Sequence, residues 1–200
     1  MRACTSMLIA SSIEARMMIR FAGYLSLVLA ALCCVVSTAG ADEDYAAAGI
    51  ALIARHGDSD LIFLVRHHKR SWYEMPGGRS QRDETAVDTA IRECYEESRG
   101  FLRAERLRDV VDPERRLIDD SFVYFVTRID WFALSEIPAA PDANDESMRA
   151  FHEAVDFAWV PVKNVISGDD GAAVDLAGRR IELRQQLKPR LLRAGAAGWL

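Results

Sequence analysis

The sequence predicts an α/β domain in which a mixed sheet carries helices on its faces. Three observations indicate this class: β-rich segments recur on both sides of a central region, that region is one strongly amphipathic helix, and a second helical region closes the chain. The chain has 200 residues, 50% of them hydrophobic, which is enough for one sizeable core. We therefore expect one domain over residues 42–200, behind a separate N-terminal segment.

Residues 1–41 are expected to be a leader and not part of this domain. Two arginines precede a charge-free stretch over residues 21–41, and the small residues 39–41 stand directly before Asp42. This is the pattern of a secretory signal peptide, which would be cleaved after residue 41. A charge-free stretch of about 20 residues also suffices to span a bilayer, so an uncleaved N-terminal anchor is the alternative. The prediction is an exported protein, periplasmic or secreted, with stable membrane contact only if the leader stays.

The charge and the cysteine content of the predicted domain exclude two classes of protein. Residues 42–200 carry 22 basic and 29 acidic residues, a net charge of −7, and no patch that suggests general nucleic-acid binding. Cys94 is the only cysteine outside the leader, so we expect no internal disulfide. Because Cys94 falls on an apolar helical stripe, we interpret it as a core residue rather than a nucleophile.

Strands are predicted on both sides of the central helix. Residues 49–55 and 61–66 are β-rich, and residues 56–60 between them are turn-forming, so a hairpin is expected. Residues 121–129, rich in Phe, Val, Tyr and Thr, are the clearest strand after the helix. A short strand is expected at residues 157–160.

The C-terminal part is predicted to be helical. Residues 172–194 carry a partial apolar face, and Pro189 is expected to interrupt that helix or to end its main segment. Residues 137–146, with two prolines and several acids, are a candidate for a flexible loop.

The central helix has clear start and stop signals. Thr85 is a good N-cap, Asp88 stands close to capping-box spacing, and Gly100 is a natural helix stop. A buried stripe of helical period runs along it through Val87, Ala90, Ile91 and Cys94.

Three carboxylates share a different face of this helix. Glu93, Glu96 and Glu97 fall at i, i+3 and i+4, roughly 115° from the apolar stripe, so we expect them at the edge of the core. Clustered carboxylates repel each other unless a cation lies among them, and Mg²⁺ takes oxygen ligands while keeping positions for water and phosphate oxygens. We interpret this face as a magnesium site; a solvated acidic face is the alternative for these three residues taken alone.

The wider pattern resembles the Nudix box of the Nudix (MutT-like) hydrolases. Six positions match that box at its spacing, namely Gly78, Glu84, Arg92, Glu93, Glu96 and Glu97. The family has glycine where this chain has Arg99, and Gly100 follows one residue late, which we interpret as a helix end shifted by one residue. The resemblance covers roughly residues 46–165 and implies a Nudix-type α/β/α sandwich with a mixed sheet.

The resemblance also implies an activity. It is the Mg²⁺-dependent hydrolysis of a diphosphate linkage in a nucleoside diphosphate derivative or a similar pyrophosphate compound, with Mn²⁺ as a substitute metal. Glu93, Glu96 and Glu97 would bind the metal, and Glu97 is the favoured general base, with Glu93 as a further catalytic candidate. Glu153 is the runner-up base or an additional metal ligand, although an ordinary exposed acid is the alternative. Glu84 and Arg92 are expected to be structural, with Arg92 orienting the glutamates.

Substrate contacts are expected from residues that precede the helix. Arg66 and Arg70 belong to a basic run, which either contacts substrate phosphates or is an exposed strand end. Gly77 and Gly78 form the turn before the helix and are also substrate-binding candidates. Trp72 and Tyr73 are expected to pack beside this turn rather than to stack on a base.

The alternative function is a catalytically weak Nudix-fold module that binds or senses a nucleotide. The intact glutamates argue for turnover, because a binder need not keep all three. We expect a small-molecule diphosphate as the partner, and a homodimer is compatible with the sequence. The box does not identify the substrate, since loops set it in this family.

Overall fold

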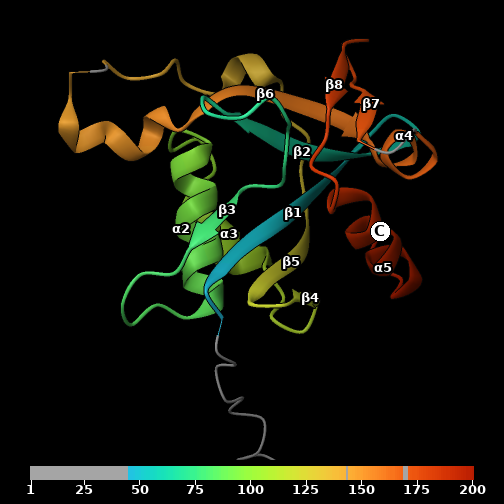
Figure 1. Ribbon diagram of the computed structural model, residues 1–200, viewed down its shortest axis with the longest axis horizontal. Helices are drawn as coiled ribbons and strands as arrows, with labels where there is room; N and C mark the ends of the chain where they lie inside the picture. Colours follow the sequence, from blue (N-terminus) through green and yellow to red (C-terminus); the bar gives the residue numbers. More distant parts are fainter. Residues whose placement is uncertain (1–44, 143, 169–170) are drawn as a thin grey trace, which may run out of the picture. The chain divides into compact units, whose positions relative to one another are not determined.

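A six-stranded sheet forms the middle layer of the protein in its computed structural model (Figure 1). The structure describes residues 45–142, 144–168 and 171–200, so the predicted leader lies outside the described residues. The described residues belong to one unit, Asp44–Leu200. Among the helices of these ranges, none has the length and apolar character that crossing a membrane requires.

The sheet is mixed, as the sequence predicts. Its order is β4-β5-β1-β2-β6, with β3 also paired to β1. The pair β1–β5 is parallel and the other pairs are antiparallel. The strands are β1 (Ala47–His56), β2 (Ser59–His67), β3 (Gly77–Arg79), β4 (Arg116–Asp119), β5 (Phe122–Ile129) and β6 (Ala154–Pro161). The four predicted strands are confirmed as β1, β2, β5 and β6.

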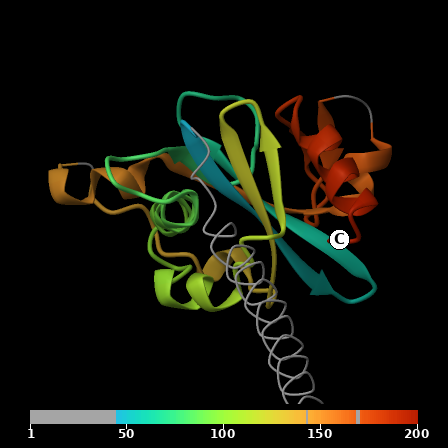
Figure 2. The ribbon, with the colours of Figure 1, turned by 90° about the horizontal axis from the view of Figure 1, so that it is seen from below.

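Helices cover both faces of the sheet, which confirms the α/β/α sandwich. Figure 2 shows the green helices α2 and α3 on one side of the strands and the red helix α5 on the other. The helices are α2 (Ala86–Glu97), α3 (Ala104–Val110), α4 (Val162–Ser167) and α5 (Leu187–Ala196), with short 3₁₀ helices η1 (Leu134–Glu136) and η2 (Glu146–His152).

Two cores form because the side chains of β1 alternate between its faces. Ile50 and Leu52 pack toward α2 and α3, whereas Ala51 and Ile53 pack toward α4 and α5. Both sets are buried, so β1 reads as a continuous apolar run, as expected for a strand that helices cover on both faces.

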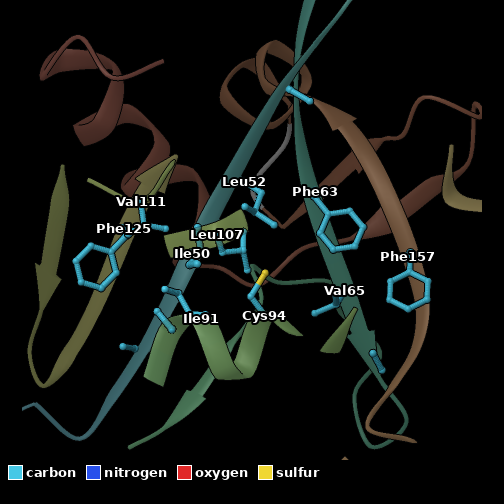
Figure 3. Close-up of a cluster of buried hydrophobic side chains, with 14 of the residues drawn as sticks. Ile50, Leu52, Phe63, Val65, Ile91, Cys94, Leu107, Val111, Phe125 and Phe157 are labelled. Carbon is cyan, nitrogen blue, oxygen red and sulfur yellow. The ribbon is translucent and has the colours of Figure 1, made fainter. Parts of the chain in front are cut away.

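Helix α2 presents its predicted stripe to the first of these cores. Figure 3 shows Ile91 and Cys94 of α2 pointing toward the strands that carry Ile50 and Phe63. Cys94 is fully buried, and this burial raises the pKa of its thiol well above its usual value. The interpretation of Cys94 as a core residue is confirmed.

The two ends of α2 differ in how well the sequence predicts them. Thr85 is the N-cap, and its hydroxyl accepts a hydrogen bond from the Asp88 amide at 3.1 Å. The prediction of a helix end shifted by one residue is wrong. Arg99 itself takes the left-handed conformation with φ +55°, its amide donates to Glu96, and the Gly100 amide donates to the Tyr95 carbonyl at 2.8 Å. These bonds form a Schellman motif in which Arg99 fills the position that the family gives to glycine.

The predicted helix over residues 172–194 is wrong in its first part. Strands β7 (Ala172–Val174) and β8 (Arg180–Glu182) form a two-stranded ribbon there, and α5 begins only at Leu187. The ribbon buries Ala173 and Ile181 in the second core, a tertiary contact that outweighs the helical preference of the alanines. Pro189 lies in the first turn of α5, where an amide has no helical acceptor, so it does not interrupt the helix.

Candidate active site

The sheet splits beside α2 because two strands share one edge of β1. Strand β3 pairs with the beginning of β1 through Ala47–Gly49, and β2 pairs with its end through Ile53–His56. Between the two pairings, the Ile50 amide donates to the Pro76 carbonyl at 3.0 Å. Gly49 permits this approach, since a Cβ there would lie 2.4 Å from the Pro76 carbonyl oxygen. The split brings the glycine turn of β3 against the C-terminal half of α2.

A cleft of about 560 Å³ lies at this split. The structure therefore brings together most of the site residues that the sequence predicts, although they come from separate elements. The predicted residues that line the cleft are Glu93, Glu96, Glu97, Glu153, Arg70, Gly77, Gly78 and Arg92. His67 and Arg149 line it as well.

Glu97 is the most enclosed carboxylate of the cleft. It is 2% exposed, and its Oε2 accepts a hydrogen bond from the Gly77 amide at 3.0 Å. Its Oε1 lies 3.0 Å from His67 Nε2. Removal from water raises the pKa of Glu97 above its usual value, although His67 and the Gly77 amide act in the opposite direction.

Glu93 and Glu96 line the same cleft with more exposure to water. Burial is the main cause that raises the pKa of each, and the negative charge of Glu153 adds to it in both cases. A group of carboxylates that all disfavour their charged form is stabilised by a nearby cation.

Arg92, for which a structural role is predicted, contacts three glutamates at this place. Its guanidinium donates to Glu84 at 2.6 Å, to Glu93 at 2.7 Å and to Glu96 at 3.1 Å. Glu84 also accepts hydrogen bonds from the Gln81 amide and the Thr89 hydroxyl, which ties the loop before α2 to the helix.

Glu84 should make the stability of the fold sensitive to acid. The hydrogen bond from Arg92 is the main reason that its pKa falls from 4.5 to about 2. Because the folded-state pKa is lowered, its contribution is complete above about pH 4.5 and is lost as the pH falls toward 2. Because solvent screens this partly exposed ion pair, its contribution is on the order of 1 kcal/mol. Urea unfolding of wild type and Glu84→Gln should show a stability difference that shrinks over this range.

The comparison with Glu84→Gln is needed because other carboxylates act with the opposite sign. The raised pKa values of Glu93, Glu96 and Glu97 mean that these groups bind protons more readily in the folded state, so they add stability as the pH falls. They are present in both proteins and largely cancel in the difference, because only the pKa of Glu96 among them responds to the charge of Glu84. A difference between the two proteins that is independent of pH would contradict the assignment to Glu84.

Arg66 lies outside the cleft, on the opposite face of β2. Its Nη2 lies 3.9 Å from Asp156, and its guanidinium carbon lies 5.9 Å from the centre of the Tyr73 ring. Tyr73 is buried and donates to Asp156, which agrees with the packing role that we predict for it. The reason is strand alternation: Val65 packs toward α2, so its neighbour Arg66 faces away.

The sequence pattern did not single out His67 or Arg149, which both line the cleft. His67 lies inside the basic run that contains Arg66 and Arg70. The period of β2 is the signal that could have found it, since Leu61, Phe63 and Val65 all pack toward α2 and residue 67 follows in that series.

Glu153 reaches the cleft from the residue just before β6. Its side chain is 59% exposed, and its Oε2 lies 3.9 Å from His67 Nδ1. The next residue is tied to α2, because Arg99 donates to the Ala154 carbonyl at 2.8 Å and lies over the Phe157 ring at 4.9 Å.

Arg99 affects the stability of the fold in two ways, through its left-handed backbone and through the hydrogen bonds of its guanidinium. Two variants should separate these effects. Arg99→Ala removes the bonds of the guanidinium to Ala154 and Pro138 but keeps a Cβ at φ +55°, whereas Arg99→Gly also removes the strain of that conformation. We expect Arg99→Gly to be more stable than Arg99→Ala by about 1 kcal/mol in urea unfolding. Equal stability of the two variants would contradict a strained backbone at this position.

The residues of the cleft fit a divalent metal ion. Glu93, Glu96 and Glu97 offer oxygen ligands from one helix, Glu153 adds another, and His67 carries a buried ring nitrogen without a hydrogen-bond partner among the described residues. Carboxylate oxygens are the ligands that Mg²⁺ and Mn²⁺ take in proteins. The repulsion among these charges would be relieved by such an ion.

A protein-family profile matches about two thirds of the chain. The profile of the NUDIX domain matches residues 44–177, and the chain belongs to the Nudix family. Nudix enzymes typically use a divalent metal, and membership in the family implies a pyrophosphohydrolase. A search of curated proteins found no match.

Several solved structures are similar to the chain at low sequence identity. An Ap4A hydrolase of C. elegans is 17% identical, with 76% of this chain and 98% of that chain covered and a TM-score of 0.44. A MutT protein of Methanosarcina mazei is 13% identical, with 80% and 99% covered and a TM-score of 0.46. The NUDIX domain of Shewanella oneidensis NrtR, solved as a complex with ADP ribose, is 14% identical, with 82% and 93% covered and a TM-score of 0.42.

Proposed function

We propose that this protein hydrolyses a diphosphate linkage in a nucleoside diphosphate derivative or a similar pyrophosphate compound. The observation that carries the proposal is the convergence of Glu93, Glu96, Glu97 and Glu153 on one cleft beside the Gly77-Gly78 turn. Such a cluster suits a divalent cation, and a diphosphate is the kind of anion that a bound cation attracts.

Glu93, Glu96 and Glu97 would hold Mg²⁺, or Mn²⁺ in its place. When bound, the ion supplies charge neutralisation at the phosphate and lowers the pKa of a water molecule. The residues around it keep the ligands in place. Arg92 fixes Glu93 and Glu96 through its guanidinium, and the Gly77 amide fixes one oxygen of Glu97.

Glu97 is our first choice for the general base. It lies on the helix that carries the other proposed metal ligands, and the hydrogen bond that its Oε2 accepts from the Gly77 amide fixes its orientation. Glu153 is the second choice, because it reaches the same cleft from a more exposed position. Gly77 and Gly78 line the cleft and stay substrate-binding candidates, although the Glu93 carboxylate and the backbone of β1 occupy the space where their side chains would lie. Arg70 lines the cleft as well, with its guanidinium paired to Glu74.

Water is the nucleophile that the cleft supports. Cys94 is buried in the core and is not available for attack. The hydroxyl of Ser80, which also lines the cleft, donates to the Ala46 carbonyl, and His67 lies at Glu97. Neither arrangement resembles a nucleophile paired with a base.

A substrate panel and isotope labelling test the proposal. The panel contains nucleotide sugars, dinucleotide polyphosphates, nucleoside triphosphates, diphosphoinositol phosphates and ADP-ribose. ADP-ribose is included because it is the ligand in the NrtR structure. Each is tested with Mg²⁺ and with Mn²⁺. In ¹⁸O-water, a cleaved diphosphate should yield label in a phosphate product. Label only in a non-phosphate product, or a trapped phosphoenzyme, would contradict the mechanism.

The same panel separates turnover from sensing. If the protein binds one of these compounds in calorimetry but does not hydrolyse it above the rate without protein, the weak nucleotide-binding module is the better description.

A further inference from the structure

His67 is buried at the floor of the cleft without a role in the proposed reaction. It is 9% exposed, and its Nε2 has no hydrogen-bond partner among the described residues. The nearest carboxylate oxygen is Glu97 Oε1 at 3.0 Å, but the two atoms do not meet in the geometry of a hydrogen bond. A buried polar nitrogen without a hydrogen-bond partner lowers the stability of the fold, and a ligand bound to it would remove this cost.

A defined irregularity of the sheet brings Glu153 beside His67, whose Nε2 also lies 3.0 Å from Glu97 and 3.8 Å from Glu74. The pairing of β2 with β6 shifts between Arg66 and His67, so that His67 opposes Ala154, the residue after Glu153. The His68 amide then donates to the Glu153 carbonyl at 3.1 Å, which fixes this register. Such bulges redirect side chains at the ends of strands.

The three side chains that meet here form a set of possible metal ligands. His67, Glu97 and Glu153 each offer one atom, and these atoms all lie within 4.8 Å of one another. The second oxygen of Glu97 is already bonded to the Gly77 amide, which leaves Oε1 facing the imidazole. Adjacent ligands of an octahedral ion with bonds of about 2.1 Å lie about 3 Å apart, close to the spacing of Glu97 Oε1 and His67 Nε2.

We propose that His67 is a nitrogen ligand of the divalent metal ion, together with Glu97 and Glu153. The inference rests on the proposed function, because it concerns the metal that this function uses. An imidazole suits borderline transition metals, whereas Mg²⁺ takes oxygen ligands and gives up its water reluctantly. The site therefore favours Mn²⁺ and related ions over Mg²⁺, and His67 sets this preference.

Mn²⁺ is a direct probe, because it is paramagnetic. Pulsed electron paramagnetic resonance of the protein with one equivalent of Mn²⁺ should show the ¹⁴N coupling of a directly bound imidazole. The coupling should disappear in His67→Gln. It should remain in His68→Gln, a matched control, because His68 is the exposed neighbour and lines a different cleft with Asp145 and His152.

Calorimetry provides a second readout that does not depend on activity. We expect His67→Gln to weaken Mn²⁺ binding about ten- to a hundredfold and to change Mg²⁺ binding little, while His68→Gln leaves both unchanged. Circular dichroism checks that the variants fold. If His67→Gln does not fold, the wild-type spectrum alone decides between a coordinated and an uncoordinated nitrogen.

The outcomes distinguish this inference from the proposed function. Bound Mn²⁺ without a coordinated nitrogen, a coupling that survives in His67→Gln, or absence of Mn²⁺ binding would overturn the inference. If the protein hydrolyses a compound of the panel but binds Mn²⁺ without a coordinated nitrogen, or keeps the coupling in His67→Gln, the proposed function is retained and only the inference is rejected. A coordinated nitrogen without hydrolysis of any diphosphate would keep the metal site and reject the function.

Discussion

Replacing Glu97 with glutamine should reduce hydrolysis by about 10³-fold and leave the fold intact. The amide cannot accept a proton from water, and it is a weaker metal ligand than a carboxylate. Its oxygen can still accept the hydrogen bond of the Gly77 amide, so the turn keeps its place. Without metal, the unfolding temperature should stay the same or rise, because a buried carboxylate with a raised pKa has been neutralised.

A matched control for this variant is Glu105→Gln. Glu105 lies exposed in the first turn of α3 and does not line the cleft. Steady-state kinetics at several Mg²⁺ concentrations should show wild-type rates for this control. Turnover like that of the wild type in Glu97→Gln at low Mg²⁺ would remove the central claim about the site.

Gly78→Ala should reduce hydrolysis by about 100-fold without unfolding the protein. A Cβ at this position would lie 2.4 Å from Glu93 Oε2, and the three nearest atoms all belong to that carboxylate group. Glu93 would have to move, and its 2.7 Å bond to Arg92 would be disturbed. A displacement on the order of 1 Å at a reacting centre can cost about 10²-fold in rate. Metal binding measured by calorimetry should weaken in parallel.

Two other glycines serve as controls for Gly78→Ala. In Gly49→Ala the new Cβ would meet the Pro76 carbonyl at 2.4 Å, which is backbone, so this variant should lose stability by about 1–3 kcal/mol or more. Gly195→Ala lies within α5 with only ordinary contact to Leu200, so it should gain about 0.5–1 kcal/mol and keep full activity. Normal activity and metal affinity in Gly78→Ala would show that neither metal binding nor hydrolysis depends on the observed position of the Glu93 carboxylate.

The local signals of the sequence predict α2 well. The cap at Thr85, the stripe through Cys94 and the acidic face at Glu93, Glu96 and Glu97 all depend on neighbours within a few turns of one helix. Helical periodicity fixes which side chains share a face before any tertiary contact forms. The strands β1, β2, β5 and β6 are predicted for the same reason, since their composition and turn signals are local.

The errors occur where tertiary contacts decide the backbone. The segment before α5 contains alanines that favour a helix, but it forms β7 and β8 because Ala173 and Ile181 complete a core that the sheet supplies. At Arg99, a left-handed backbone that usually requires glycine is kept while its guanidinium bonds to Pro138 and Ala154. Neither partner is apparent from the residues around Arg99.

The sequence by itself determined the family, the helix with its three glutamates and the outline of a mixed sheet, because each follows from short-range spacing. The tertiary structure decided which distant residues join those glutamates. Glu153 enters the cleft because β2 pairs with β6 in one register with one shift, whereas the alternation of β2 turns His67 toward the cleft and Arg66 away from it. Pairing between strands far apart in the chain therefore decides that Glu153 and His67 meet, and that pairing is a property of the whole sheet.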